Sequence, residues 1–190
     1  MNDRKPPCNR LVWMDLEMTG LDPDTDTILE IATIITDSDL NIVAEGPNLV
    51  IHHDAEALAR MGEWCRAHHG ASGLSARALA SRMTLREAEQ RTLAFIREHA
   101  PEREAPLCGN SIHQDRRFLA RHMPAIDAWL HYRMIDVSTI KELVRRWYPA
   151  LPIPAKQSEH LALADIRESI EELRYYRQRV FIPPDGNAQT

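Results

Sequence analysis

Two carboxylates at the end of a short apolar run are the first residues in this sequence whose types and spacing could do chemistry. Asp15 and Glu17 follow the run 10–14, and a Gly-Leu-Asp-Pro turn at 20–23 comes soon after them. Side chains on a strand alternate between faces, so the two acids share one face. Buried like charges take up protons unless a cation joins them, and Mg²⁺ or Mn²⁺ suits carboxylate ligands. The alternative is that the acids only mark the polar end of a strand.

Two more acids and a histidine lie later in the chain. Asp115 follows a predicted short strand at the start of a helix, where it could reach the end of the sheet. An acid in a first helical turn is also a common surface feature, because it suits the helix dipole. His160 and Asp165 are five residues apart, or about 140° around a helix, so they cannot share one helical face. We therefore place His160 on the loop before a helix and Asp165 inside it, although His160 could also simply cap or pack.

The elements that must position these residues are strands first and then strands alternating with helices. Runs rich in apolar and β-branched residues predict strands at 10–16, 27–36 and 41–51, joined as an antiparallel meander that is irregular at Gly46-Pro47. Short strands are expected at 106–110 and 134–136. Helices are expected at 54–61, 62–69, 85–99 (opened by a Thr84–Glu87 capping box), 115–122, 139–148 (capped by Ser138 or Thr139) and 161–179. This order predicts an α/β fold with a mixed five-stranded sheet flanked by helices.

Size, composition and charge bound the remaining possibilities. A chain of 190 residues suits one domain, which we place at 10–180 between an N-terminal tail (1–9) and a flexible C-terminal tail (181–190). No apolar run approaches the length of a membrane span, and the first ten residues lack the apolar segment of a secretory signal, so we expect a cytoplasmic protein. The three cysteines fit reduced thiols. The net charge of −5 argues against tracking long nucleic acid and favours a short substrate if nucleic acid is bound at all.

The order and spacing of these acids and the histidine, taken together, indicate a family more specifically than any single acid does. Asp-x-Glu, a mid-chain Asp and a late His-x4-Asp, in this order and at this spacing, resemble the DEDD exonuclease superfamily in the subgroup named for its histidine. The resemblance is closer still to the oligoribonuclease family, and it covers nearly everything from residue 11 to residue 180. The segments that carry it are 13–23, 30–33, 44–47, 71–74, 108–112, 114–119, 136–139 and 165–169. The resemblance implies an RNase H-like fold, a homodimer, and 3′→5′ removal of nucleotides from very short RNA oligonucleotides, down to dinucleotides.

The resemblance also implies roles for particular residues. Two Mg²⁺ or Mn²⁺ ions about 3.5–4 Å apart would clamp the attacking and leaving oxygens of an in-line phosphoryl displacement. Their ligands would be Asp15, Glu17, Asp115 and Asp165. His160, with an ordinary pKa of about 6.5, would take the proton of the attacking water.

For the substrate, the resemblance implies an apolar wedge at Leu21, with Trp64 and His69 as stacking or phosphate-contacting groups. Ser111 lies in a matched segment beside Asp115, and Ser138 would lie near the 5′-phosphate. The segment His131-Tyr132-Arg133 would reach across from a partner subunit. Trp64 and Tyr132 could instead be core residues, and Arg133 a solvated charge. His113 stands where the family would have a small residue, and it would either touch substrate or point to solvent.

Three other functions remain open at this point. A proofreading-type DNA exonuclease could use the same fold, but it would need a groove for longer strands. A catalytically silent nucleotide-sensing module is disfavoured because all four carboxylates and His160 are present. A zinc hydrolase built on Cys65, His68 and His69 lacks a second Cys/His pair at a standard spacing.

Overall fold

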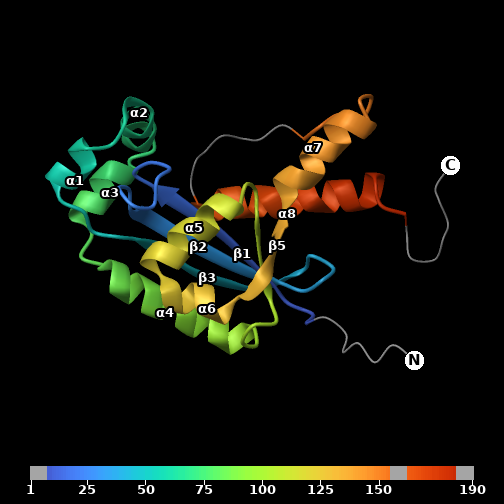
Figure 1. The fold of residues 1–190 in the computed structure, drawn as a ribbon, viewed down its shortest axis with the longest axis horizontal. Coiled ribbons are helices and arrows are strands. Elements are labelled where there is room, and N and C mark those ends of the chain that lie inside the picture. The colour runs from blue at the N-terminus through green and yellow to red at the C-terminus, as the bar shows by residue number, and fades with distance from the viewer. Residues whose placement is uncertain (1–7, 155–161, 183–190) are drawn as a thin grey trace.

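The computed structural model describes residues 8–154 and 162–182 of the chain (Figure 1). Most of the two expected tails lies outside the described residues, and so does His160. No helix of the described ranges is long and apolar enough to cross a membrane.

A mixed sheet of five strands forms the centre of the fold, as expected (Figure 1). Its strands lie side by side in the order β3-β2-β1-β4-β5. The first three form an antiparallel meander, whereas β4 pairs parallel with β1 and β5 pairs parallel with β4. The strands are β1 (Leu11–Met18), β2 (Ile28–Thr36), β3 (Ile42–Val50), β4 (Pro106–Gly109) and β5 (His131–Asp136). The sheet therefore places β1, with its two acids, at the centre.

The expected irregularity in β3 is a bulge. Ala32 pairs with Asn48 and Ile34 with Glu45, so β3 contains one residue more than β2 over this stretch. A Cβ at Gly46 would lie 2.6 Å from the Phe95 ring, so only glycine lets the bulged strand pack against the helix that carries Phe95.

Eight helices surround the sheet in the described part of the chain. The predicted capping box is present at the start of the helix after Thr84, where Thr84 and Glu87 each bond the other's backbone. Two short helices, α3 (Leu74–Ala80) and α6 (Pro124–Trp129), were not predicted. The helices are α1 (Ala55–Ala59), α2 (Glu63–Ala71), α3 (Leu74–Ala80), α4 (Leu85–His99), α5 (His113–His122), α6 (Pro124–Trp129), α7 (Val137–Trp147) and α8 (Ala162–Arg179).

The predicted cap of α7 was wrong. Asp136, rather than Ser138 or Thr139, is the N-cap residue, and its carboxylate accepts a hydrogen bond from the Ser138 N–H. The physical reason is that β5 runs directly into α7. Its last residue keeps an extended backbone and offers a side-chain oxygen to the first helical turn.

Two apolar cores lie on opposite faces of the sheet, and β1 contributes alternately to both. Val12, Met14 and Leu16 pack with α4, α5 and α6, whereas Leu11 and Trp13 pack with α7 and α8. Because side chains on a strand alternate, Asp15 and Glu17 belong to the face of Trp13, over which α8 lies. The strand period therefore directs both acids toward α8.

Candidate active site

Three carboxylates from two elements converge at the end of β1. Asp15 and Glu17 come from the strand, and Asp165 comes from the first turn of α8. One oxygen from each lies within 4.8 Å of the other two. Within residues 8–154 and 162–182, this is the one group of at least three His, Cys, Asp or Glu side chains close enough to hold a metal ion. A set of carboxylate oxygens suits a hard divalent cation such as Mg²⁺ or Mn²⁺.

The fourth predicted acid, Asp115, lies beside this group but outside the set of three. Its buried Oδ1 accepts a hydrogen bond from the Leu16 N–H at 2.9 Å. The pairing of β4 with β1 covers only Val12 and Trp13, so the N–H of Leu16 lies beyond the reach of β4. The chain turns from β4 into α5, and Asp115 of α5 supplies the acceptor at that point.

Burial and nearby negative charges raise the pKa of two of these acids, Glu17 and Asp115. Burial, followed by the charges of Asp165, Glu30 and Asp115, raises the pKa of Glu17 to about 8. Burial also raises the pKa of Asp115 to about 7, against the lowering effect of the hydrogen bond from Leu16. A divalent cation would favour the charged forms and displace these protons. The donor chemistry and the electrostatics therefore both fit a divalent metal ion.

Glu30 is a buried acid beside the site that the sequence analysis did not select. It lies directly opposite Glu17 in the register of β1 and β2, and its side chain is 0% exposed. Arg77 of α3 neutralises it through an Nη1–Oε1 contact of 2.9 Å. A lone charge in the otherwise uncharged strand 27–36 is a signal that could have revealed this pair, because a buried charge requires a partner.

Of the residues expected at the substrate, Leu21 and Trp64 are exposed, which excludes a core role for Trp64. The Leu21 carbonyl accepts a hydrogen bond from Gln114 Nε2 at 2.5 Å, which ties the turn after β1 to α5. The Trp64 ring stacks on His68 with ring centroids 4.5 Å apart. Both side chains therefore present apolar surface to solvent.

His69 lies against the acid group. The residue is only 2% exposed, and its Nε2 is 2.8 Å from the Met18 carbonyl oxygen. Its Nδ1 is 3.9 Å from Glu17 Oε2. The ring therefore has little free face on which a base could stack.

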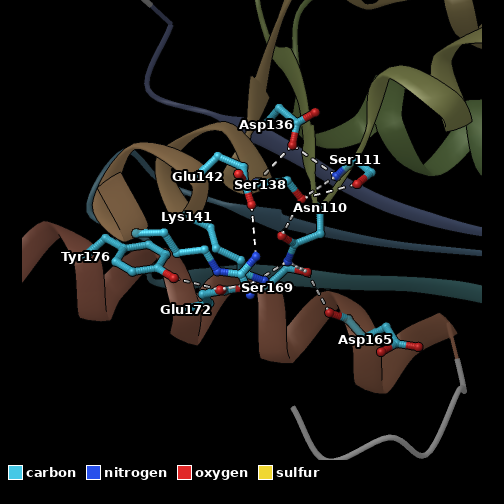
Figure 2. Close-up of polar contacts among 11 residues, drawn as sticks. Asn110, Ser111, Asp136, Ser138, Lys141, Glu142, Asp165, Ser169, Glu172 and Tyr176 are labelled. Carbon is cyan, nitrogen blue, oxygen red and sulfur yellow. Dashed lines mark hydrogen bonds and ion pairs between the residues drawn. The ribbon is translucent and has the colours of Figure 1, made fainter. Parts of the chain in front are cut away.

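Ser111 and Ser138 are brought together at the ends of β4 and β5 (Figure 2). The Ser111 N–H donates to both Asp136 Oδ1 and Ser138 Oγ at 3.0 Å, and the two hydroxyl oxygens are 3.2 Å apart. Ser111 adopts a left-handed backbone with φ of 52°. His113 is exposed, and its Nδ1 is 3.4 Å from Asp136 Oδ2, so it contacts the same carboxylate as Ser111.

The remaining expected residues lie on β5, at the edge of the sheet. Tyr132 is 73% exposed, which excludes a core role, and the Arg133 guanidinium lies 5.3 Å from the centroid of its ring. The rings of His131 and Tyr132 are 4.5 Å apart between centroids. None of the three belongs to the acid group of this chain.

Comparison with known proteins gives the family. The RNase_T exonuclease family model matches residues 12–173. Oligoribonuclease of Pseudomonas savastanoi pv. phaseolicola is 60% identical over 174 residues, which cover 92% of this chain and 97% of that protein. The chain belongs to the oligoribonuclease family. Oligoribonuclease of Vibrio vulnificus is 58% identical, and the match covers 90% of this chain and 95% of that protein.

Solved structures similar to this member of the oligoribonuclease family show the same fold at lower identity. Exonuclease I from Methylocaldum szegediense superposes with a TM-score of 0.69 at 22% identity, over 91% of this chain and 41% of that one. E. coli exonuclease I in a complex with single-stranded DNA gives a TM-score of 0.70 at 16% identity, over 90% and 41% of the respective chains. This chain thus spans about two-fifths of these larger proteins, and the likeness confirms the expected RNase H-like fold.

The zinc alternative finds no support in this oligoribonuclease family member. Cys65 belongs to no metal-sized group among residues 8–154 and 162–182. The His69 ring contacts Met18 and Glu17, and the His68 ring stacks on Trp64. The histidines of the 65–69 segment are thus engaged elsewhere.

Proposed function

We propose that this protein is a metal-dependent 3′→5′ exoribonuclease that hydrolyses very short RNA, down to dinucleotides, to nucleoside 5′-monophosphates. The observation that carries the proposal is the convergence of Asp15, Glu17 and Asp165 within 4.8 Å, beside buried Asp115. The names of its relatives, which are oligoribonucleases at 58–60% identity, support the short RNA substrate.

The four acids would hold two Mg²⁺ or Mn²⁺ ions. When bound, such ions stabilise the charge that develops on the attacking and leaving oxygens of a phosphoryl displacement. The chain's part is to hold the ligands in place. β1 fixes Asp15 and Glu17 on one face, α8 presents Asp165 to that face, and the Leu16 N–H orients Asp115.

His160 would be the general base that takes a proton from the attacking water. An imidazole with a pKa near 6.5 is suited to this task at neutral pH. Its place in the sequence, two residues before α8 begins at Ala162 and five before Asp165, supports this assignment.

The substrate would lie between an exposed apolar surface and a polar end. Leu21 would separate the two bases and Trp64 would stack on one of them, a contact worth about 1–3 kcal/mol per base. The burial of His69 beside Glu17 supports contact with the phosphate rather than base stacking. The paired hydroxyls of Ser111 and Ser138 would receive the 5′-phosphate, and this closed end would select the shortest RNA.

A homodimer would complete the site. Large apolar side chains of β5, of α7 and of the residue after α7 are exposed, and large exposed apolar patches usually mark interfaces. They are Tyr132, Met134, Leu143, Trp147 and Tyr148. A second copy covering this patch would bring His131, Tyr132 and Arg133 of one subunit to the substrate of the other. We place the protein in the cytoplasm, which the absence of disulfides among Cys8, Cys65 and Cys108 supports.

The test is a length series of substrates. 5′-Phosphorylated RNAs of two, seven and twenty nucleotides, and a twenty-nucleotide single-stranded DNA, are incubated with Mn²⁺ or with chelator. We expect the dinucleotide to be hydrolysed at least about tenfold faster than the longer strands, and no hydrolysis in chelator. Faster cleavage of the long DNA would favour a DNA exonuclease, and binding without hydrolysis in Mn²⁺ would favour a nucleotide sensor.

A further inference from the structure

A partly buried chain of hydrogen bonds connects the paired serines to α8, and Asn110 stands at its centre (Figure 2). Asn110 Oδ1 accepts from Ser138 Oγ at 3.0 Å. Asn110 Nδ2 donates to Ser169 Oγ at 2.8 Å and to Glu172 Oε2 at 3.1 Å. Ser169 Oγ in turn donates to the Asp165 carbonyl at 2.8 Å. One amide thus joins the serine pair to the helix that carries Asp165.

Glu172 determines which way the Asn110 amide faces. Its buried carboxylate contacts Lys141 Nζ at 2.8 Å and accepts from the Tyr176 hydroxyl at 2.9 Å, both at Oε1. A carboxylate paired with an ammonium only accepts hydrogen bonds, so the Oε2 side must meet the NH₂ end of the amide. The carbonyl end of Asn110 is therefore directed at Ser138.

The direction of the amide decides which serine has a proton to donate. A hydroxyl carries one proton, and Ser138 uses it on Asn110 Oδ1. Ser138 Oγ also accepts from the Ser111 N–H. While these bonds hold, Ser138 can only accept from the Ser111 hydroxyl, 3.2 Å away. A phosphate oxygen that replaces Ser138 as the acceptor would therefore take its hydrogen bond from Ser111.

We propose that Asn110 is a positioning residue that makes Ser111, rather than Ser138, the hydroxyl donor to the 5′-phosphate of the substrate. Ser138 holds the backbone and hydroxyl of Ser111 in place, and Glu172 with Lys141 holds Asn110. The same amide, through Ser169, fixes the position of this phosphate subsite relative to α8. The inference rests on the proposed short-RNA function, because it assigns the roles within its phosphate subsite.

The test compares binding of the 5′-phosphorylated and 5′-hydroxyl forms of one RNA dinucleotide, measured by calorimetry in Ca²⁺ so that it does not depend on turnover. The readout is the ratio of the two dissociation constants. Losing a hydrogen bond to a charged group typically weakens binding about tenfold or more. We expect Ser111→Ala to lower the preference for the 5′-phosphate about tenfold, and Ser138→Ala to lower it by less than about threefold.

Asn110→Ala provides the second arm, because it releases the Ser138 proton. In the Asn110→Ala protein, Ser111→Ala should lower the preference for the 5′-phosphate less than it does in the unmodified protein, because Ser138 can then donate to the phosphate. Tyr176→Phe is the matched control. It removes a bond to Glu172 on the side away from Asn110, and should leave the preference unchanged within about twofold.

The inference would be overturned if the two serine variants lost the same preference for the 5′-phosphate, or if Ser138→Ala lost more. This comparison does not require Asn110→Ala to fold. Failure of the proposed function has a different signature. In that case the dinucleotide binds with the expected preference but is not hydrolysed in Mn²⁺.

Discussion

Asp115 Oδ1 accepts a hydrogen bond from the Leu16 N–H at 2.9 Å, so the acid of α5 is attached to the strand residue that lies between Asp15 and Glu17. The bond also satisfies a strand N–H beyond the paired stretch of β4. It brings the charge of Asp115 close enough to contribute to the raised pKa of Glu17. Buried carboxylates are thus concentrated at the end of β1.

The metal-free protein should lose stability as the pH rises toward 8. The folded-state pKa is raised to about 8 for Glu17 and to about 7 for Asp115, from ordinary values of 4.5 and 3.8. The folded state therefore binds more protons than the unfolded state in this window, and the free energy of unfolding falls with rising pH. Urea unfolding in chelator between pH 5 and pH 9 measures this slope.

Glu17→Gln is the control for the pH prediction, because it removes one of the two groups whose pKa is raised. It should flatten the slope, and Mn²⁺ should restore stability to the unmodified protein at pH 8 by binding the folded state. A free energy of unfolding that rises with pH across this window, or an identical slope in the variant, would contradict the electrostatic account.

Arg77→Met should destabilise the protein by about 3 kcal/mol, because it leaves the buried Glu30 carboxylate without its cation. The value is at the low end for a buried pair, since the Arg77 side chain is 39% exposed. The double variant Arg77→Met, Glu30→Met should regain most of the loss. Arg167→Met, which breaks the exposed pair with Glu45, should cost at most about 1 kcal/mol. Equal losses in Arg77→Met and Arg167→Met by chemical denaturation would refute a buried-charge effect.

His160→Ala should lower turnover of a dinucleotide by about 10²–10⁴-fold while Mn²⁺ affinity is retained, because the lost group moves a proton and is not a metal ligand. The measurements are kcat between pH 6 and pH 9 and a Mn²⁺ titration by calorimetry. Equal activity of the variant and the unmodified protein across this range would end the general-base assignment.

Trp147→Glu should convert a dimer to a monomer, because it places a charge in the exposed apolar patch of β5 and α7. Sedimentation velocity measures the outcome. Trp64→Glu is the matched control, because Trp64 is similarly exposed, at 70% against 66%, but lies outside the patch. A protein that is already monomeric, or that stays dimeric with Trp147→Glu, would rule out this surface as the interface.

Local sequence patterns were sufficient to predict most of the sheet and the long helices. The apolar runs around Trp13 and Ile31 predict β1 and β2, and the Thr84–Glu87 capping box correctly marks the start of α4. The short helices α3 and α6 were missed, because so few residues carry little periodicity. α3 is held by the packing of Leu74 and Ala78 against residues such as Leu29 and Leu58.

The site was harder to predict from local sequence patterns, because its contacts join distant parts of the chain. Strand alternation predicts that Asp15 and Glu17 share a face, but only the packing of α8 on that face brings Asp165 to them. The assignment of the four acids came from their joint resemblance to a family. The Glu30–Arg77 pair and the burial of His69 beside Glu17 depend on helices α2 and α3 and their placement.

The most direct test of the central claim is an anomalous difference map from crystals grown with Mn²⁺. The account predicts two manganese peaks at the end of β1, contacted between them by the carboxylates of Asp15, Glu17, Asp115 and Asp165. Manganese bound only elsewhere, or no peak at this position at millimolar Mn²⁺, would contradict it.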